Sequence, residues 1–160
     1  MTDAPPAPSA RTLRILVDAD ACPVKEEIYK VAFRTNVPVT VVANSFIRLP
    51  QHPLISRVVV DAGPDVADDH IASEAGPLSI VVTADIPLAD RCLKVGATVI
   101  APNGKPFTDA SIGAAMAMRS LMQDLRAGGD QIGGPPPFQP RDRSQFLQAL
   151  DAAIVRLRRG

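Results

Sequence analysis

Two aspartates end an apolar stretch near the start of the chain, in the segment ILVDADACP at residues 15–23. Asp18 and Asp20 are two positions apart, so their side chains point to the same side if the backbone stays extended as far as Ala21. Two carboxylates at the carboxyl end of a buried strand repel each other, which is a poor arrangement for stability alone. The pair therefore indicates that a positively charged group binds there.

More aspartates lie at boundaries between the elements that the sequence predicts. Asp65 and Asp68 begin a helix, and Asp85 ends an apolar strand. If four such carboxylates met about 6 Å apart, each pair would cost on the order of 3 kcal/mol at an effective dielectric constant of about 20. A divalent cation or strongly raised pKa values would offset that repulsion. Because the ligands are hard oxygens without a His or Cys cluster, we expect Mg²⁺ or Mn²⁺, which activate water and neutralise phosphate charge.

Structural explanations stay open for the same residues. Asp65 fits a helix N-cap, Asp68 suits the dipole of a first helical turn, and Asp85 fits a turn or cap. Asp18 and Asp20 fit capping poorly, because they finish an otherwise apolar strand.

The elements around these acids alternate between strands and helices. Apolar, β-branched runs predict strands at residues 13–20, 37–44, 57–63, 78–85 and 97–102. The spacing of apolar residues predicts helices at residues 23–36, 65–76, 87–96, 108–126 and 142 onward, with a loop at 45–56. In the long fourth helix we expect Ile112, Met118 and Leu125 to face inward, and we expect Asp142 to cap the last helix.

This alternation predicts an α/β fold with a mostly parallel sheet covered by helices on both faces. In such sheets, ligands bind outside the carboxyl ends of the strands, at the point where the strand order reverses. Asp18, Asp20 and Asp85 are predicted at two of these strand ends.

The composition suits one domain in a chain of 160 residues, 46% of them hydrophobic. We expect a disordered lead-in at residues 1–11, an α/β domain at 12–127, and a linker and C-terminal helix at 128–160 that pack on the same domain. The sequence has no signal-peptide pattern, membrane-spanning run or disulfide framework, so the cytoplasm is the expected location. Lys plus Arg equals Asp plus Glu at 17 each, so nucleic-acid binding would depend on local patches.

Two further residues are expected to contact substrate. Arg119 on the long helix is the predicted phosphate contact, and Asn44 ends the second predicted strand. Cys22 has no His near it in the sequence, so we interpret it as a packed side chain and not as a nucleophile.

Six segments together resemble the YaiI/YqxD family of uncharacterised bacterial proteins. They are VDADACP (17–23), GPDVADDHIA (63–72), VVTADIPLAD (81–90), KVGATVIAPNGK (94–105), MAMR (116–119) and QPRDRSQF (139–146). The resemblance extends from about Leu13 to the C-terminus. The family is similar to the PIN-like nuclease fold, a three-layer α/β/α sandwich with an acidic metal site.

The resemblance implies specific roles for the acids. Asp18, with Asp20, matches the first-strand acid, and Asp85 matches the acid of the T-x-D strand end. Asp65 and Asp68 match the acids of DVAD. Asp18, Asp65 and Asp85 are therefore expected as metal ligands, and all five as catalytic acids. Asp69 and Asp90 are not assigned in this way, and the 45–56 loop and the C-terminal helix are not part of a minimal PIN core.

The expected function is Mg²⁺- or Mn²⁺-dependent hydrolysis of phosphodiesters, with RNA as the substrate rather than DNA. Residues 15–22 also satisfy the short opening motif of haloacid-dehalogenase-like phosphatases, in which Asp18 would be the nucleophile and Asp20 the general acid. That mechanism needs a separate Thr or Ser strand end and a later lysine, and this pattern is not evident. A non-catalytic, metal-stabilised module that binds nucleic acid is the third hypothesis.

Overall fold

Six strands form one sheet in the computed structural model, which describes residues 12–20, 22–63, 65–127 and 138–159. The strands are β1 (Arg14–Asp18), β2 (Val39–Ala43), β3 (Ile55–Val59), β4 (Ser79–Val82), β5 (Thr98–Ile100) and β6 (Pro106–Phe107). Their order across the sheet is β3-β2-β1-β4-β5-β6. The first five are parallel and β6 runs antiparallel to β5, so the sheet is mostly parallel, as the sequence predicted.

The central strands are apolar because helices cover both faces of the sheet. Every residue of β1, β2 and β4 is buried, which is typical of parallel strands in an α/β protein. From β1 the chain passes to β2 and β3 on one side, and then returns to β4 and β5 on the other. The strand order therefore reverses between β1 and β4, and the crevice at their carboxyl ends is the expected ligand position.

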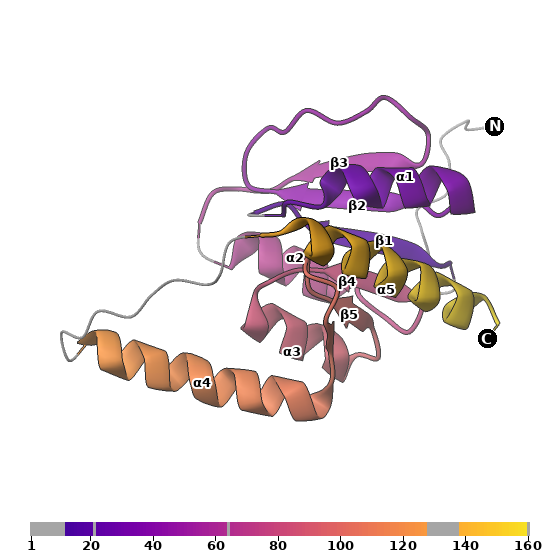
Figure 1. Cartoon of the computed structure of the whole chain (residues 1–160). Coiled ribbons are helices and arrows are strands. Elements are labelled where there is room, and N and C mark those ends of the chain that lie inside the picture. The colour runs from indigo at the N-terminus through magenta and orange to yellow at the C-terminus, as the bar shows by residue number, and fades with distance from the viewer. Residues whose placement is uncertain (1–11, 21, 64, 128–137, 160) are drawn as a thin grey trace.

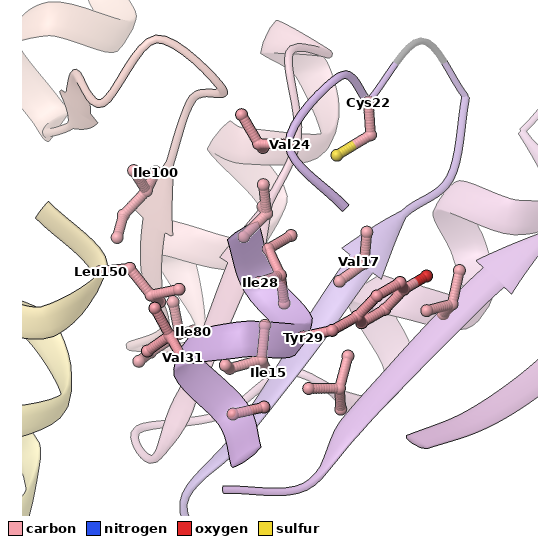
Figure 2. Close-up of a cluster of buried hydrophobic side chains, with 14 of the residues drawn as sticks. Ile15, Val17, Cys22, Val24, Ile28, Tyr29, Val31, Ile80, Ile100 and Leu150 are labelled. Carbon is pink, nitrogen blue, oxygen red and sulfur yellow. The ribbon is translucent and has the colours of Figure 1, made fainter. Parts of the chain in front are cut away.

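Five helices complete the layers in the described part of the chain (Figure 1). They are α1 (Lys25–Thr35), α2 (Val66–Glu74), α3 (Ile86–Lys94), α4 (Asp109–Ala127) and α5 (Pro140–Arg158). Helices α1 and α5 contact each other and bury one core with the sheet, part of which Figure 2 shows. Helices α2 and α3 bury a second core on the opposite face. The predicted three-layer α/β/α sandwich is confirmed.

Several element boundaries differ from the sequence prediction. Strand β1 ends at Asp18, earlier than predicted, and Asp20 lies in the turn that follows. Strand β3 begins inside the predicted loop, because its pairing with β2 starts at Ile55. The two-residue strand β6 was not predicted, since a pair of residues has no detectable periodicity.

The start of the last helix was also predicted wrongly. Gln139 is the N-cap of α5, and Asp142 is three residues inside the helix, where its carboxylate accepts the backbone N–H of Gln139. This is a capping box. Pro140 suits the first helical position, because it has no backbone N–H that would need a hydrogen-bond acceptor there.

Helix α4 has a different inward face from the one expected. Ile112 is 5% exposed, but Met118 is 53% exposed and Leu125 is 37% exposed. The helix packs against α3 near its N-terminus and then extends away from the sheet, so its later apolar residues stay largely exposed (Figure 1). The helical periodicity was real, but it did not reveal where the partner surface ends.

Two sequence expectations fall outside the described residues: the lead-in at residues 1–11 and most of the linker, at residues 128–137. In the described part of the chain, none of the helices combines the length and the apolar character needed to cross a membrane.

Candidate functional site

A cleft of about 580 Å³ lies at the carboxyl ends of β1, β2 and β4. Five aspartates line it, together with small residues that leave it open: Asp18, Asp20, Asn44, Gly63, Asp65, Ala67, Asp68, Ala84 and Asp85. All five predicted acids and Asn44 therefore meet at one place, the point where the strand order reverses. Arg119 lies on the exposed surface of α4 and is not among the lining residues.

Asp18 is the most buried acid of the cleft, at 7% exposure. One of its carboxylate oxygens accepts a hydrogen bond from the Thr83 hydroxyl at 2.9 Å, and the other lies 3.4 Å from the backbone nitrogen of Asp20. Burial raises the pKa of Asp18, and the hydrogen bond from Thr83 partly opposes that shift. The carboxyl is thus fixed in direction and sensitive to any charge in the cleft.

Thr83 connects two of the candidate acids, and the sequence analysis assigned it no part in this site. Its hydroxyl donates to Asp18 and accepts the backbone N–H of Asp85 at 3.0 Å. A hydroxyl has one proton to donate and lone pairs to accept with, so both bonds form at once. Its position two residues before Asp85, at the end of a buried strand, was the available signal.

Asp85 acts as the N-cap of α3, because its carboxylate accepts the backbone N–H of Leu88 at 2.9 Å. This is the structural explanation that the sequence left open, and it is compatible with a role in the cleft. One carboxylate oxygen is used by the cap, while the residue as a whole lines the cleft. The positive end of the α3 dipole also lies there and favours an anion.

Asp65 and Asp68 are brought to the cleft by the start of α2. Asp65 is at the N-cap position but makes no capping hydrogen bond through its side chain, and its φ of 68° is in the left-handed region. A non-glycine residue in this region costs about 1–3 kcal/mol and is often found where a site requires it. Asp65 therefore occupies the N-cap position, as the structural explanation predicted, but its side chain does not cap the helix.

Asp68 shows the repulsion within the cleft most clearly. Loss of solvent contact is the main cause that raises its pKa to about 6, and the charges of Asp85 and Asp18 contribute next. Its neighbour Asp69 points elsewhere and pairs with Arg91 at 2.7 Å. Asp90 likewise pairs with Lys94 on the surface of α3, so neither of these two acids belongs to the cleft lining.

The donor set suits a hard cation, because it consists of carboxylate and amide oxygens with no Lys or Arg among the described lining residues. The acids are nevertheless not drawn together into a tight ligand set. Across the described residues, no group of three or more His, Cys, Asp or Glu side chains is close enough to hold a metal ion. The geometry therefore fits an ion that keeps several of its own waters and contacts only one or two carboxylates, as Mg²⁺ usually does.

Cys22 is buried in the first core, as Figure 2 shows. Burial raises the pKa of its thiol, which keeps it protonated at neutral pH. Its interpretation as a packed side chain is consistent with both observations.

Comparison with known proteins finds a match over residues 16–156 to a family described as "Uncharacterized BCR, YaiI/YqxD family". Relatives share high identity along nearly the whole chain. A UPF0178 protein of Sphingopyxis alaskensis is 68% identical over 91% of this chain and 96% of its own length. A UPF0178 protein of Nitrobacter winogradskyi is 64% identical over 92% of this chain and 94% of its own length. One from Bradyrhizobium diazoefficiens is 60% identical over 99% of this chain and 91% of its own length.

Proposed function

The chain belongs to the YaiI/YqxD family, and we propose that it is a nuclease that uses Mg²⁺ or Mn²⁺ to hydrolyse phosphodiester bonds in RNA. One observation supports this function above the others: five aspartates from three segments line one cleft, and no described lining residue is Lys or Arg. A phosphate can approach such a cleft only when a cation offsets its negative charge.

Asp18, Asp65 and Asp85 would hold the ion, one or two of them directly and the others through its waters, with Asp20 and Asp68 completing the acidic surface around it. When bound, a divalent ion lowers the pKa of a coordinated water and neutralises charge on the phosphate.

The chain's own groups have separate tasks in this proposal. Thr83 keeps the Asp18 carboxylate in one orientation through its 2.9 Å hydrogen bond. The carboxamide of Asn44, exposed at the edge of the cleft, can donate to a phosphate oxygen. Asp20 or Asp68 can accept the proton of the attacking water. Arg119 stays a predicted phosphate contact that the cleft lining does not support.

The phosphatase alternative is less well supported by the cleft. A covalent phosphoenzyme on Asp18 would need a cation from the protein beside the phosphate, such as the later lysine of that mechanism. No Lys or Arg is among the described lining residues, and Asp18 is 7% exposed and held by Thr83.

The test is cleavage of end-labelled single-stranded RNA, hairpin RNA and single-stranded DNA in Mn²⁺, in Mg²⁺ and in EDTA. Asp85→Asn is the key variant, because asparagine is as good an N-cap as aspartate and preserves the start of α3. Asp90→Asn is the matched control, since it removes a carboxylate from the same helix outside the cleft. We expect metal-dependent cleavage by wild type and Asp90→Asn, and a loss of at least about 10- to 100-fold in Asp85→Asn, the range seen when metal ligation is weakened.

Other results would contradict the proposal in distinguishable ways. Equal cleavage by wild type and Asp85→Asn indicates a contaminating nuclease. Metal binding that raises the melting temperature without any cleavage supports the non-catalytic module. Turnover of small phosphate monoesters in place of RNA supports the phosphatase.

A further inference from the structure

A second hollow, of about 500 Å³, lies in the loop between β2 and β3 and is lined entirely by residues from 46–57. In Figure 1 this loop extends along the β3 side of the sheet. It begins directly after Asn44, which lines the acidic cleft. Two residues of extended chain cover at most about 7 Å, so Phe46 at the start of the hollow is close to the cleft.

Phe46 presents an aromatic surface to solvent. Its side chain is 72% exposed. The guanidinium of Arg57 lies 4.2 Å from the centre of the ring, and one of its nitrogens donates to the backbone carbonyl of Ile47 at 2.9 Å. The ring is therefore oriented by a cation on one face, and its exposure leaves the opposite face for another flat group.

His52 forms another part of the wall and is also held in place. Its ring centre is 4.3 Å from that of Phe33, and its Nδ1 accepts the backbone N–H of Leu54 at 3.1 Å. In a neutral imidazole this leaves the proton on Nε2, which is then a donor available to a ligand.

The charge around the hollow is positive, in contrast to the cleft. Residues 28–60 contain four Lys or Arg and no Asp or Glu. Arg48 lines the hollow, is exposed, and makes no hydrogen bond or ion pair with any residue that the structure describes. A free guanidinium beside an exposed ring is suited to a phosphate next to a stacked base.

We propose that this hollow binds one nucleotide of a single-stranded RNA, with the base stacked on Phe46 and an adjacent phosphate bound by Arg48. This inference rests on the proposed nuclease function, because it places the same strand across both hollows, with its scissile phosphate at the acidic cleft. A single strand is required, since bases inside a duplex do not expose a face to an aromatic side chain.

The test is fluorescence anisotropy with short labelled single-stranded RNA, single-stranded DNA and duplex RNA. EDTA is present throughout, so that metal-dependent cleavage cannot consume the probe, and the probe is short enough to occupy the loop hollow without entering the acidic cleft. We expect wild type to bind the single-stranded RNA more tightly than the duplex. Phe46→Ala should weaken that binding by about 5- to 150-fold, the range expected for one lost base stack, whereas Phe46→Trp should preserve it. Arg48→Gln should weaken binding and reduce the slope of log Kd against log salt by about 1.

Two variants serve as matched controls. Met118→Ala removes an exposed apolar side chain, and Arg156→Gln an exposed charge, and neither residue lines the cleft or the loop hollow. Both should bind like wild type. Unchanged binding by Phe46→Ala, or equal affinity for the duplex, overturns the proposal even when wild type cleaves RNA. Loss of binding in Phe46→Ala without cleavage by wild type supports the hollow and contradicts the nuclease function.

Discussion

Asp68 is the residue at which the electrostatics of the cleft can be measured most directly. Its pKa of about 6 in the folded chain exceeds the usual 3.8, so between these two values the folded state holds more protons than the unfolded state. The free energy of unfolding of the metal-free protein therefore falls as the pH rises through this window. Asp68→Asn removes the carboxylate charge whose desolvation and repulsion by Asp85 and Asp18 cause this loss of stability. We expect it to stabilise the protein by roughly 1 kcal/mol at pH 7.5, after allowance for solvent screening, and by nothing near pH 4.

Urea unfolding of the metal-free protein across this pH range measures the effect, with Asp69→Asn as the control. Asp69 lies in the same helical turn but pairs with Arg91, so its substitution should cost about 0.2–1 kcal/mol at pH 7.5. The two substitutions should therefore change the free energy of unfolding at pH 7.5 in opposite directions. Destabilisation by both would show that Asp68 is not repelled by its neighbours.

Residue types and their spacing predicted which acids meet, because strand ends of a parallel sheet share one edge. They could not predict how the acids are held. The bridge through Thr83 depends on β1 and β4 being neighbours, and the left-handed backbone of Asp65 depends on the turn before α2. The first is a property of the strand order and the second of a turn conformation, and neither leaves a signature in the spacing of residue types along the chain.

At the scale of elements, the turn after β5 depends on one glycine. Gly104 has a φ of +89°, and a Cβ built on it would lie 2.5 Å from the backbone carbon of Gln145 in α5. Gly104→Ala should therefore lower the free energy of unfolding by about 2–4 kcal/mol, through a left-handed backbone penalty and overpacking against a helix that cannot yield easily.

Gly113 in α4 provides the matched control. Nothing lies within 4 Å of the Cβ that alanine would add there. Gly113→Ala should stabilise the protein by about 0.5–1 kcal/mol, because alanine is the better helix former. Thermal unfolding of the two variants and wild type measures both changes in stability. If Gly104→Ala left the free energy of unfolding unchanged, the turn and α5 would not be in contact in solution.

Elements were predicted well where the pattern was local and poorly where it depended on a partner. The strand–helix alternation could be read from the chain. The exposure of Met118 and Leu125 could not, because helical periodicity indicates an apolar face without indicating what covers it.

For the whole molecule, the sequence supported a mostly parallel, three-layer sandwich but not its strand order or its antiparallel edge. The expectation that the C-terminal helix packs on the same domain did not specify which surface of the sheet or which helix it contacts. In the structure, α5 contributes Phe146, Leu150, Ala153 and Ile154 to the same buried core as α1. The Arg143–Glu27 ion pair connects the two helices as well.

This shared core predicts that α5 and the sheet unfold together. Phe146 is completely buried, so Phe146→Ala should lower the free energy of unfolding by about 3–5 kcal/mol, a large part of a typical total of about 5–15 kcal/mol.

The chain has one tyrosine and no tryptophan, and Tyr29 on α1 is buried in this core, so its fluorescence reports on the core directly. The urea midpoint measured by Tyr29 fluorescence should move together with the midpoint measured by far-UV circular dichroism. Leu121→Ala, at an exposed position of α4, should change the free energy of unfolding measured by either probe by no more than about 0.5 kcal/mol. If Phe146→Ala left the tyrosine transition in place, α5 would be an appendage and the core on that face would be complete without it.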